Sequence, residues 1–212
     1  LMQQRTLAFI GAGNMSRSII AGLIQAGYPA GRIIAANPSR PKLDELADQF
    51  GIRITQNNAE AAREADVIVL AVKPQLMAAM LEALVAELGS LAGKLLISIA
   101  AGIKVERLQE MAGGHSRIIR TMPNTPSLLG LGMTGLYAPS GIEQADRDFA
   151  EQMMQAVGKT LWVAQESGIN GVIAAAGSAP AYFFLFMQGI AEEAEAMGFT
   201  PEQARLLVQQ TA

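Results

Sequence analysis

The sequence predicts an α/β fold, in which a doubly wound and mostly parallel sheet is followed by a segment made of helices alone. Three observations support this prediction. Short apolar runs alternate with amphipathic stretches from the N-terminus to Gln165. Runs such as Val67–Val72 are apolar at every position, which is typical of parallel strands covered on both faces. After Gln165 the strand pattern ends and only helical periodicity follows.

The apolar runs predict eight short strands, each bounded by polar or turn-forming residues. In chain order they are Leu7–Gly11, Ile33–Ala36, Ile52–Thr55, Val67–Val72, Leu95–Ile99, Arg117–Thr121, Met133–Tyr137 and Thr160–Val163. Because helical stretches separate most of these runs, we expect the strands to be mostly parallel and joined by crossovers that cover the sheet.

The stretches between the strands show apolar residues at the spacing of a helix face. The first runs from Asn14 to Ala26 and is stopped by Gly27. The next has Pro41 near its start, where the missing amide would have no partner in any case. It is expected to end near Phe50, and it is followed before the boundary by helices at Gln75–Leu88, Val105–Met111 and Glu143–Val157.

The change of pattern near residue 165 predicts two domains. Residues 1–164 would form the α/β domain, and residues 165–212 would begin a helical dimerisation or substrate domain. The chain ends within an amphipathic stretch that has no capping signal. We therefore expect the helical domain to continue past Ala212.

The stretch Val172–Ile190 is apolar and about long enough to cross a bilayer. We expect Gly177, Ser178 and Pro180 to break it into a short helix, a turn and a second helix that is buried on most sides. A helix that is apolar all round needs a partner surface. This segment therefore predicts a subunit interface of a homo-oligomer, with no membrane as partner.

Composition excludes several classes of function. The 212 residues carry 16 Lys and Arg against 19 Asp and Glu, and no stretch is strongly basic, so nucleic acid is not an expected partner. The chain has no cysteine, which excludes disulfides and thiolate catalysis and fits a cytoplasmic location. Its one histidine, His115, cannot form a histidine-rich metal site, and no metal is expected.

The first strand ends abruptly in a Gly-x-Gly turn. Gly11 and Gly13 lack a Cβ, so the backbone can turn tightly and approach the phosphates of a ligand. The helix that follows would direct its N-terminal amides at a pyrophosphate. Ser16 replaces the third glycine of G-x-G-x-x-G, where close packing of helix on strand is the main demand. Because it follows a strand, the motif predicts a Rossmann-type dinucleotide-binding domain.

The end of the second strand indicates which dinucleotide is bound. NAD-binding sites usually have Asp or Glu there, whereas this chain has Asn37, followed by Ser39 and Arg40. A neutral side chain beside a hydroxyl and a guanidinium suits a 2′-phosphate, because arginine binds phosphate with paired donors. These residues favour NADP(H) over NAD(H). Alternatively, Arg40 is a solvated charge in a loop.

Three further residues each have two interpretations. Lys73, restricted to an extended conformation by Pro74, lies either beside the nicotinamide or on the surface at a strand end. Asn58 is either a helix N-cap or a donor near the adenosine. Asn124, in a stiff loop framed by two prolines, either contacts the substrate or holds the turn.

Five motifs give the chain a resemblance to a known family. In chain order they are GAGNM at 11–15, AVKPQ at 71–75, SIAAG at 98–102, RTMPNTP at 120–126 and GSAPAYFF at 177–184. In this order and spacing they resemble pyrroline-5-carboxylate reductases. That family reduces L-1-pyrroline-5-carboxylate to L-proline with NADPH or NADH, the last step of proline synthesis. The resemblance also implies a Rossmann domain followed by helices that intertwine subunits into dimers and often into rings of dimers.

The resemblance implies roles for individual residues. The pyrophosphate would be held by the first motif, at Gly11, Ala12, Gly13, Asn14 and Met15. The adenosine side would comprise Asn37, Ser39, Arg40 and Asn58. The nicotinamide side would comprise Val72, Lys73 and Ala101, and the candidate substrate contacts are Asn124 and Ser178, the latter at the opening of the dimerisation helix.

The chain also departs from the family pattern. The last motif is usually similar to SGSGPAY, but Ala176 replaces its first serine and Ala179 a residue that is usually small. The family's Ser-Pro-Gly-Gly-Thr-Thr-like loop, which holds the substrate carboxylate, is expected beyond residue 212.

The expected chemistry matches what the chain lacks. A cyclic imine is protonated near neutral pH and accepts hydride directly, so the enzyme needs positioning more than a strong acid or base. We therefore expect no essential catalytic acid within residues 1–212. Glu166 is the charged candidate near the domain junction, although such a residue more often caps or flanks a helix.

Two rival interpretations remain at this stage. A β-hydroxyacid dehydrogenase would need a general acid/base lysine on the first helices of the second domain, and the sequence has no lysine after Lys159. The other rival is a catalytically silent dinucleotide-binding protein whose helices serve only for association.

Overall fold

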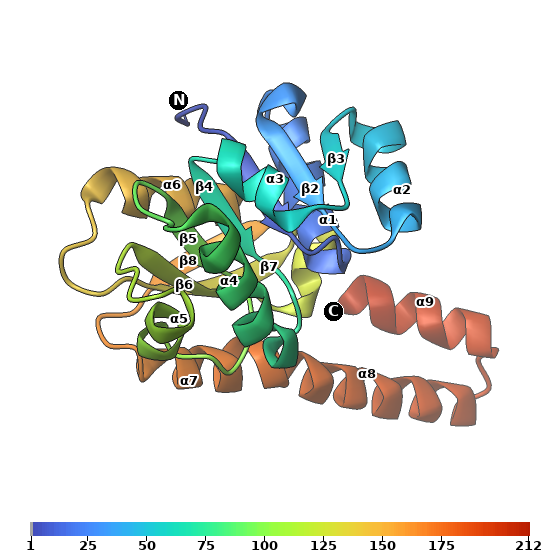
Figure 1. Cartoon of the computed structure of the whole chain (residues 1–212). Helices are drawn as coiled ribbons and strands as arrows, with labels where there is room; N and C mark the ends of the chain where they lie inside the picture. Colours follow the sequence, from blue (N-terminus) through green and yellow to red (C-terminus); the bar gives the residue numbers. More distant parts are fainter. Residues whose placement is uncertain (1) are drawn as a thin grey trace. The chain divides into compact units, whose positions relative to one another are not determined.

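The computed structural model describes residues 2–212, which form two compact units. The first unit ends at Ile169 and the second spans Asn170–Ala212. The first contains one eight-stranded sheet with the strand order β3-β2-β1-β4-β5-β6-β7-β8 (Figure 1). The predicted fold class, a mostly parallel sheet followed by helices, is confirmed.

The strands lie close to their predicted positions. They are β1 (Leu7–Ile10), β2 (Ile33–Ala36), β3 (Arg53–Thr55), β4 (Val67–Leu70), β5 (Leu95–Ser98), β6 (Ile118–Met122), β7 (Gly132–Tyr137) and β8 (Gly158–Trp162). Strands β6 and β7 pair antiparallel, while every other neighbouring pair is parallel. The exception arises because the connection between these two strands is too short to form a crossover over the sheet.

Helices cover both faces of the sheet (Figure 1). They are α1 (Asn14–Gln25), α2 (Arg40–Phe50), α3 (Asn58–Glu64), α4 (Pro74–Leu88), α5 (Val105–Met111) and α6 (Gln144–Gln155), with short 3₁₀ helices η1 (Ala30–Arg32) and η2 (Thr125–Leu129). Alternate residues of β1 separate the two cores: Leu7 and Phe9 pack with α1, α2 and α6, while Ala8 and Ile10 pack with α3, α4 and α5. All four are fully buried, which explains the continuous apolar run.

The second unit contains helices alone, and here one expectation is wrong. Instead of a turn near Gly177 to Pro180, the chain continues as one helix from Gly168 to Ala196. This helix comprises α7 (Gly168–Val172), a π-helical turn η3 (Ile173–Ser178) and α8 (Ala179–Ala196). Proline normally breaks a helix because its ring clashes with the carbonyl four residues earlier. The wider turn just before Pro180 accommodates it within the helix.

A helical hairpin completes the second unit. Helix α9 (Pro201–Thr211) begins with a capping box in which Thr200 Oγ1 accepts from the amide of Gln203, and Gln203 Oε1 accepts from the amide of Thr200. Between α8 and α9, Gly198 adopts a φ of +102°. The amphipathic stretch at the end of the chain, for which the sequence pattern indicates no bounds, corresponds to α9.

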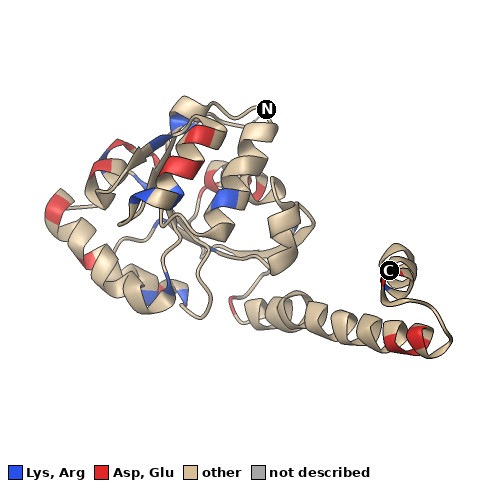
Figure 2. Cartoon of the chain, turned by 90° about the vertical axis from the view of Figure 1, so that its right-hand side faces the viewer, with Lys and Arg blue, Asp and Glu red and all other residues tan. Residues whose placement is uncertain are grey.

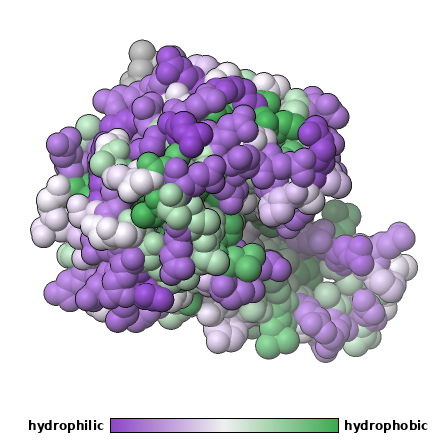
Figure 3. Space-filling view, in the orientation of Figure 1, coloured by the Kyte–Doolittle hydropathy of each residue, from purple (hydrophilic) through white to green (hydrophobic). Residues whose placement is uncertain are grey.

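Helix α8 is exposed within this chain, so the burial expected on most of its sides would have to come from the predicted subunit interface. Its large apolar side chains include Phe183 and Phe186, which are 70% and 71% exposed. Charged residues are confined to its C-terminal end in Figure 2, and apolar residues are visible along the hairpin in Figure 3. Within the second unit, α9 leaves these side chains uncovered, although such a helix requires a partner surface.

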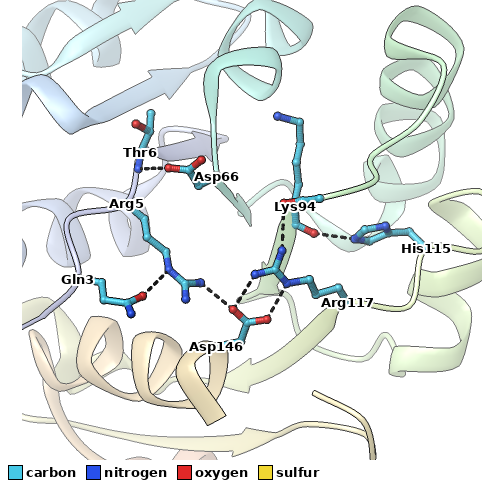
Figure 4. A network of polar contacts seen from close by, with 9 residues as sticks. Gln3, Arg5, Thr6, Asp66, Lys94, His115, Arg117 and Asp146 are labelled. Carbon is cyan, nitrogen blue, oxygen red and sulfur yellow. Dashed lines mark hydrogen bonds and ion pairs between the residues drawn. The ribbon is translucent and has the colours of Figure 1, made fainter. Parts of the chain in front are cut away.

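A polar network lies at the edge of the sheet where the parallel strands begin (Figure 4). Asp146 of α6 is 1% exposed and accepts hydrogen bonds from Arg117 and Arg5. Burial opposes ionisation of Asp146, but these two guanidinium groups outweigh it and lower the pKa of the carboxyl group. Nearby, Asp66 accepts from the amide of Thr6, which fixes the approach to β1.

Candidate functional site

The glycine turn lies where β1 ends, at the opposite edge of the sheet from the Asp146 network. Gly11 has a φ of +107°, and a Cβ added there would lie 2.5 Å from the backbone oxygen of Ala71. The amide of Gly11 donates to Ala36 O at 2.9 Å, and the amide of Ala71 donates to Ile10 O at 2.9 Å. The turn is therefore held between the ends of β2 and β4 and requires glycine at its first position.

The N-terminus of α1 opens directly after this turn. Its N-cap is Gly13, no side chain in residues 2–212 caps its first amides, and its first turn contains no acidic residue. A Cβ added to Gly13 would meet no atom within 4 Å apart from its chain neighbours. Open amides and the helix dipole favour an anion at this position. The site thus fits the pyrophosphate of a dinucleotide.

Ser16 shows why a serine can replace the third glycine. It is 1% exposed, and its hydroxyl donates to the backbone oxygen of Gly11 at 2.8 Å. The side chain is small enough for close packing of α1 on β1, and its polar atom is satisfied. It therefore also fixes the carboxyl end of the strand at the turn.

The loop after β2 presents the residues expected on the adenosine side. Asn37 Oδ1 accepts from the amide of Ala12 at 3.3 Å, and its Nδ2 donates to the backbone oxygen and the hydroxyl of Ser39, both at 3.2 Å. The amide side chain thus links this loop to the glycine turn. The Arg40 side chain is 60% exposed and pairs with Asp44 at 2.8 Å. Asn37 takes the place of the Asp or Glu that, in NAD-binding domains, accepts from the hydroxyls of a ribose without a 2′-phosphate.

The N-cap interpretation of Asn58 is wrong. The N-cap of α3 is Asn57, whose Oδ1 accepts from the amides of Ala59 and Glu60 at 2.9 and 3.1 Å. Asn58 is the first residue inside the helix. Two consecutive asparagines made the capping position ambiguous by one residue, which is the usual uncertainty at helix ends. Its alternative role near the adenosine stays a prediction.

The residues expected on the nicotinamide side follow two neighbouring strands. Val72 and Lys73 come after β4, which ends at Leu70 and not at Val72 as expected. Lys73 is extended and forms the N-cap of α4, and its side chain is exposed. Ala101 lies in an exposed turn after β5. Since β4 and β5 pair in parallel, these residues extend from the same edge of the sheet as the glycine turn.

The two candidate substrate contacts lie in different units. Asn124 is the N-cap of η2, and its Oδ1 accepts from the amide of Met133 at 2.8 Å, so it holds the connection between β6 and β7. Ser178 is exposed and ends the π-helical turn. The turn-holding role of Asn124 is therefore present, and contact of either residue with substrate stays a prediction.

Sequence reasoning missed one buried charged pair beside this edge. Arg120 lies within β6 and is only 4% exposed, and its Nη1 donates to Glu166 Oε2 at 3.1 Å. The same oxygen accepts from the amide of Val105 at 2.8 Å. An arginine inside the apolar run Ile118–Met122 was a signal for such a pair. Its partner could not be identified because it lies 46 residues away.

The order β3-β2-β1-β4-β5-β6, with an open helix N-terminus after β1, defines the class: a Rossmann-type dinucleotide-binding protein. The pyrroline-5-carboxylate reductase of Vibrio alginolyticus is 56% identical over 211 residues, which cover 100% of this chain and 77% of the relative. The chain therefore belongs to the pyrroline-5-carboxylate reductase family. That of Pseudomonas aeruginosa is 44% identical over 211 residues, with the same coverage of both chains.

Family models and solved structures agree. Residues 6–102 match the model described as NADP oxidoreductase coenzyme F420-dependent, and residues 166–212 match pyrroline-5-carboxylate reductase dimerisation. The reductase structure from Coxiella burnetii has a TM-score of 0.94 at 42% identity, covering 99% of this chain and 77% of that one. The enzyme from Plasmodium falciparum, with NADP bound, has a TM-score of 0.84 at 28% identity and covers 100% and 77%.

These findings confirm the predicted activity. The chain is an oxidoreductase of proline biosynthesis that reduces pyrroline-5-carboxylate with NAD(P)H. Its substrate is a small molecule, and the match to a dimerisation model supports the expected oligomerisation through the helical segment.

Proposed function

We propose that residues 1–164 form the cofactor half of this reductase and that residues 165–212 begin its dimerisation and substrate half. Gly11, Ala12, Gly13, Asn14 and Met15 hold the pyrophosphate of the cofactor. The observation that carries this assignment is the cradle at Gly13, where a Cβ would meet no atom and the amides of α1 are uncapped. When bound, the cofactor supplies the hydride. The residues of this chain bind and orient the reactants.

The other site residues divide between the two ends of the dinucleotide. We assign Asn37, Ser39, Arg40 and Asn58 to the adenosine end, and Val72, Lys73 and Ala101 to the nicotinamide end. The neutral Asn37 beside an exposed guanidinium supports NADP(H) as the preferred cofactor, with NAD(H) as the alternative. Asn124 and Ser178 stay as candidate substrate contacts.

Replacement of Arg40 with alanine tests the cofactor preference. NADPH binding should weaken by roughly 1–3 kcal/mol, the usual range for a hydrogen bond to a charged group, while NADH binding changes little. Titration of cofactor fluorescence measures both affinities. Arg107→Ala is a matched control, because Arg107 is similarly exposed and pairs with Glu110 on α5. Equal losses for the two cofactors would refute contact between Arg40 and the 2′-phosphate.

We propose that no side chain of this chain acts as an essential acid. Glu166 Oε2 already accepts from Arg120 and from the amide of Val105, so this oxygen serves as an acceptor. A protonated cyclic imine needs only to be positioned against the hydride donor. Substitutions at Lys73, Asn124 or Ser178 should therefore reduce turnover without abolishing it. Complete loss of turnover at one of them, with cofactor affinity intact, would contradict this proposal.

The decisive experiment is an assay of NADPH oxidation with L-1-pyrroline-5-carboxylate. This chain is compared with a form extended past Ala212 to the length of its relatives. Turnover in the extended form alone would support a substrate-carboxylate loop in the added segment. Cofactor binding without turnover in either form would favour the silent dinucleotide-binding protein.

We further propose that the exposed face of α8 is covered by a second copy in a homodimer, with a ring of dimers as the larger assembly. The apolar length of Gly168–Ala196 would also suit a membrane span. The match of residues 166–212 to a dimerisation model supports a subunit interface over a membrane as the partner of this helix, and the biosynthetic relatives are consistent with a cytoplasmic location. The net negative charge of the chain argues that nucleic acid is not a partner. Light scattering of the purified protein, with and without Phe186→Glu, measures the assembly.

A further inference from the structure

The pair Arg120–Glu166 joins three segments that are far apart in the sequence. Arg120 lies in β6, Val105 begins α5, and Glu166 follows β8. Oxygen Oε2 of Glu166 accepts from Arg120 Nη1 at 3.1 Å and from the amide of Val105 at 2.8 Å. A buried guanidinium requires a compensating charge, and the carboxylate of Glu166 supplies it.

Glu166 acts on α5 as a cap supplied from outside the helix. The N-cap residue of α5 is Lys104, and it makes no side-chain capping bond. The first amides of a helix have no partner within the helix. The carboxylate of Glu166, 61 residues along the chain, satisfies the amide of Val105 instead.

This cap determines where the β5–α5 loop ends. The loop, residues 99–104, is attached at its start by the amide of Ile99, which donates to Leu70 O at 3.2 Å, and by the amide of Ala100, which donates to the Ser98 hydroxyl at 3.2 Å. Its middle is an exposed turn at Ala101 and Gly102. At its far end, the contact of Glu166 with the Val105 amide adds to the burial of the Ile103 and Val105 side chains. The loop is therefore held at both ends, and its exposed turn at Ala101 and Gly102 lies between these anchors, next to the buried Ile103.

We propose that Glu166, held by Arg120, is a positioning residue that fixes the Ala101 loop against the nicotinamide end of the cofactor. This inference depends on the proposed assignment of Ala101. Glu166 is also the first residue of the segment that matches the dimerisation model. The clamp, defined as Arg120, Glu166 and the Val105 amide, thus ties the nicotinamide-side loop to the start of the segment through which the family associates.

Two substitutions separate the parts of the clamp. Glu166→Gln keeps an acceptor for the Val105 amide and removes the charge opposite Arg120, whereas Glu166→Ala removes both. We expect kcat to fall roughly tenfold to hundredfold in Glu166→Ala, because small misplacements of reacting groups have effects of this size. The fall should be smaller in Glu166→Gln. The Kd for NADPH should change less than about threefold, because the adenosine and pyrophosphate contacts are intact.

A second measurement does not depend on turnover. Hydrogen exchange of the cofactor-free chain should speed up at the amides of residues 99–105 in Glu166→Ala, with no change at the glycine turn. If Glu166→Ala fails to fold, the double variant Arg120→Met/Glu166→Gln removes both charges together and replaces it in both measurements. That variant loses the ion pair that holds residue 166, so its kcat should fall below that of the unsubstituted protein and its amide exchange at residues 99–105 should be faster.

The control for a merely structural role is Asp146→Asn, which breaks the two ion pairs of a buried carboxylate at the opposite edge of the sheet. It should lower stability without changing kcat well below its unfolding temperature. Unchanged kcat in Glu166→Ala, with a loss of stability like that of the control, would overturn the proposal. A loss of NADPH affinity as large as the loss of kcat would also overturn it. Failure of the proposed function is seen separately, as absence of turnover in the unsubstituted extended form.

Discussion

Replacement of Gly11 with alanine is expected to destabilise the protein by about 2–5 kcal/mol and to abolish cofactor binding. The backbone at Gly11 has a φ of +107°, which is unfavourable for any residue with a Cβ. The added Cβ would lie 2.5 Å from the oxygen and 2.7 Å from the carbonyl carbon of Ala71. Since Ala71 is hydrogen-bonded to Ile10, relief of the clash requires β1 and β4 to separate where the cofactor binds.

Two other glycines separate the causes of this effect. Gly27→Ala introduces a side chain at a φ of +92° where no atom lies within 4 Å, so it reports the backbone strain alone. Gly13→Ala meets no protein atom and has a negative φ, so it should weaken NADPH binding while stability changes by less than about 1 kcal/mol. Urea unfolding and NADPH titration measure the three variants. A Gly11→Ala protein no less stable than Gly27→Ala would show that the contact with Ala71 is tolerated.

Local patterns predicted the strand, turn and helix at the proposed pyrophosphate site because these parts are close in sequence. The apolar strand, the glycine turn and the helix that follows occupy residues 7–25, and the pattern specifies each of them. The loop proposed for the adenosine end could similarly be located from the sequence, because Asn37, Ser39 and Arg40 directly follow a predicted strand. In both cases the residues follow a parallel strand directly, and the carboxyl ends of parallel strands lie at the same edge of the sheet.

Other features could not be predicted because they depend on distant residues or on backbone adjustments without a clear signal. In the clamp, Glu166 is 46 positions from Arg120 and 61 positions from Val105, and no local spacing in the sequence reveals such contacts. A turn was expected at Gly177 to Pro180 from residue preferences, but a π-helical turn absorbs the proline within a continuous helix. Apolarity all round α8 indicated a subunit interface, and the match of residues 166–212 to a dimerisation model supports oligomerisation through this segment.

The second large effect is expected for Asp146→Asn, which should lower the free energy of unfolding by about 3 kcal/mol near neutral pH. Asp146 is 1% exposed and accepts from Arg117 Nε at 2.6 Å, from Arg117 Nη2 at 2.8 Å and from Arg5 Nη1 at 2.7 Å. The asparagine keeps the shape but leaves two cations without a counter-charge. Removal of one partner of a buried ion pair costs about 3–5 kcal/mol, and we expect a loss at the lower end of this range because Arg117 is partly exposed.

The same substitution should change the dependence of stability on pH. The pKa of Asp146 is lower in the folded protein than in the unfolded chain, because the hydrogen bonds and charges of Arg117 and Arg5 outweigh its burial. Its contribution is therefore fully present above the unfolded pKa, near 3.8, and is lost as the pH falls through the folded pKa. The stability difference between the native protein and Asp146→Asn should accordingly shrink in acid. Urea unfolding across this range measures it.

Asp148→Asn provides the matched comparison for this prediction. Asp148 lies on the same helix, is exposed, and accepts a hydrogen bond from Gln144 at 2.7 Å. Its substitution should change stability by less than about 0.5 kcal/mol at any pH, because an exposed polar contact exchanges freely with water. A deficit of Asp146→Asn that stayed constant in acid would mean that the carboxylate charge does not stabilise the fold. The loss would then arise from packing at α6, and the network of Figure 4 would only fill space at this edge of the sheet.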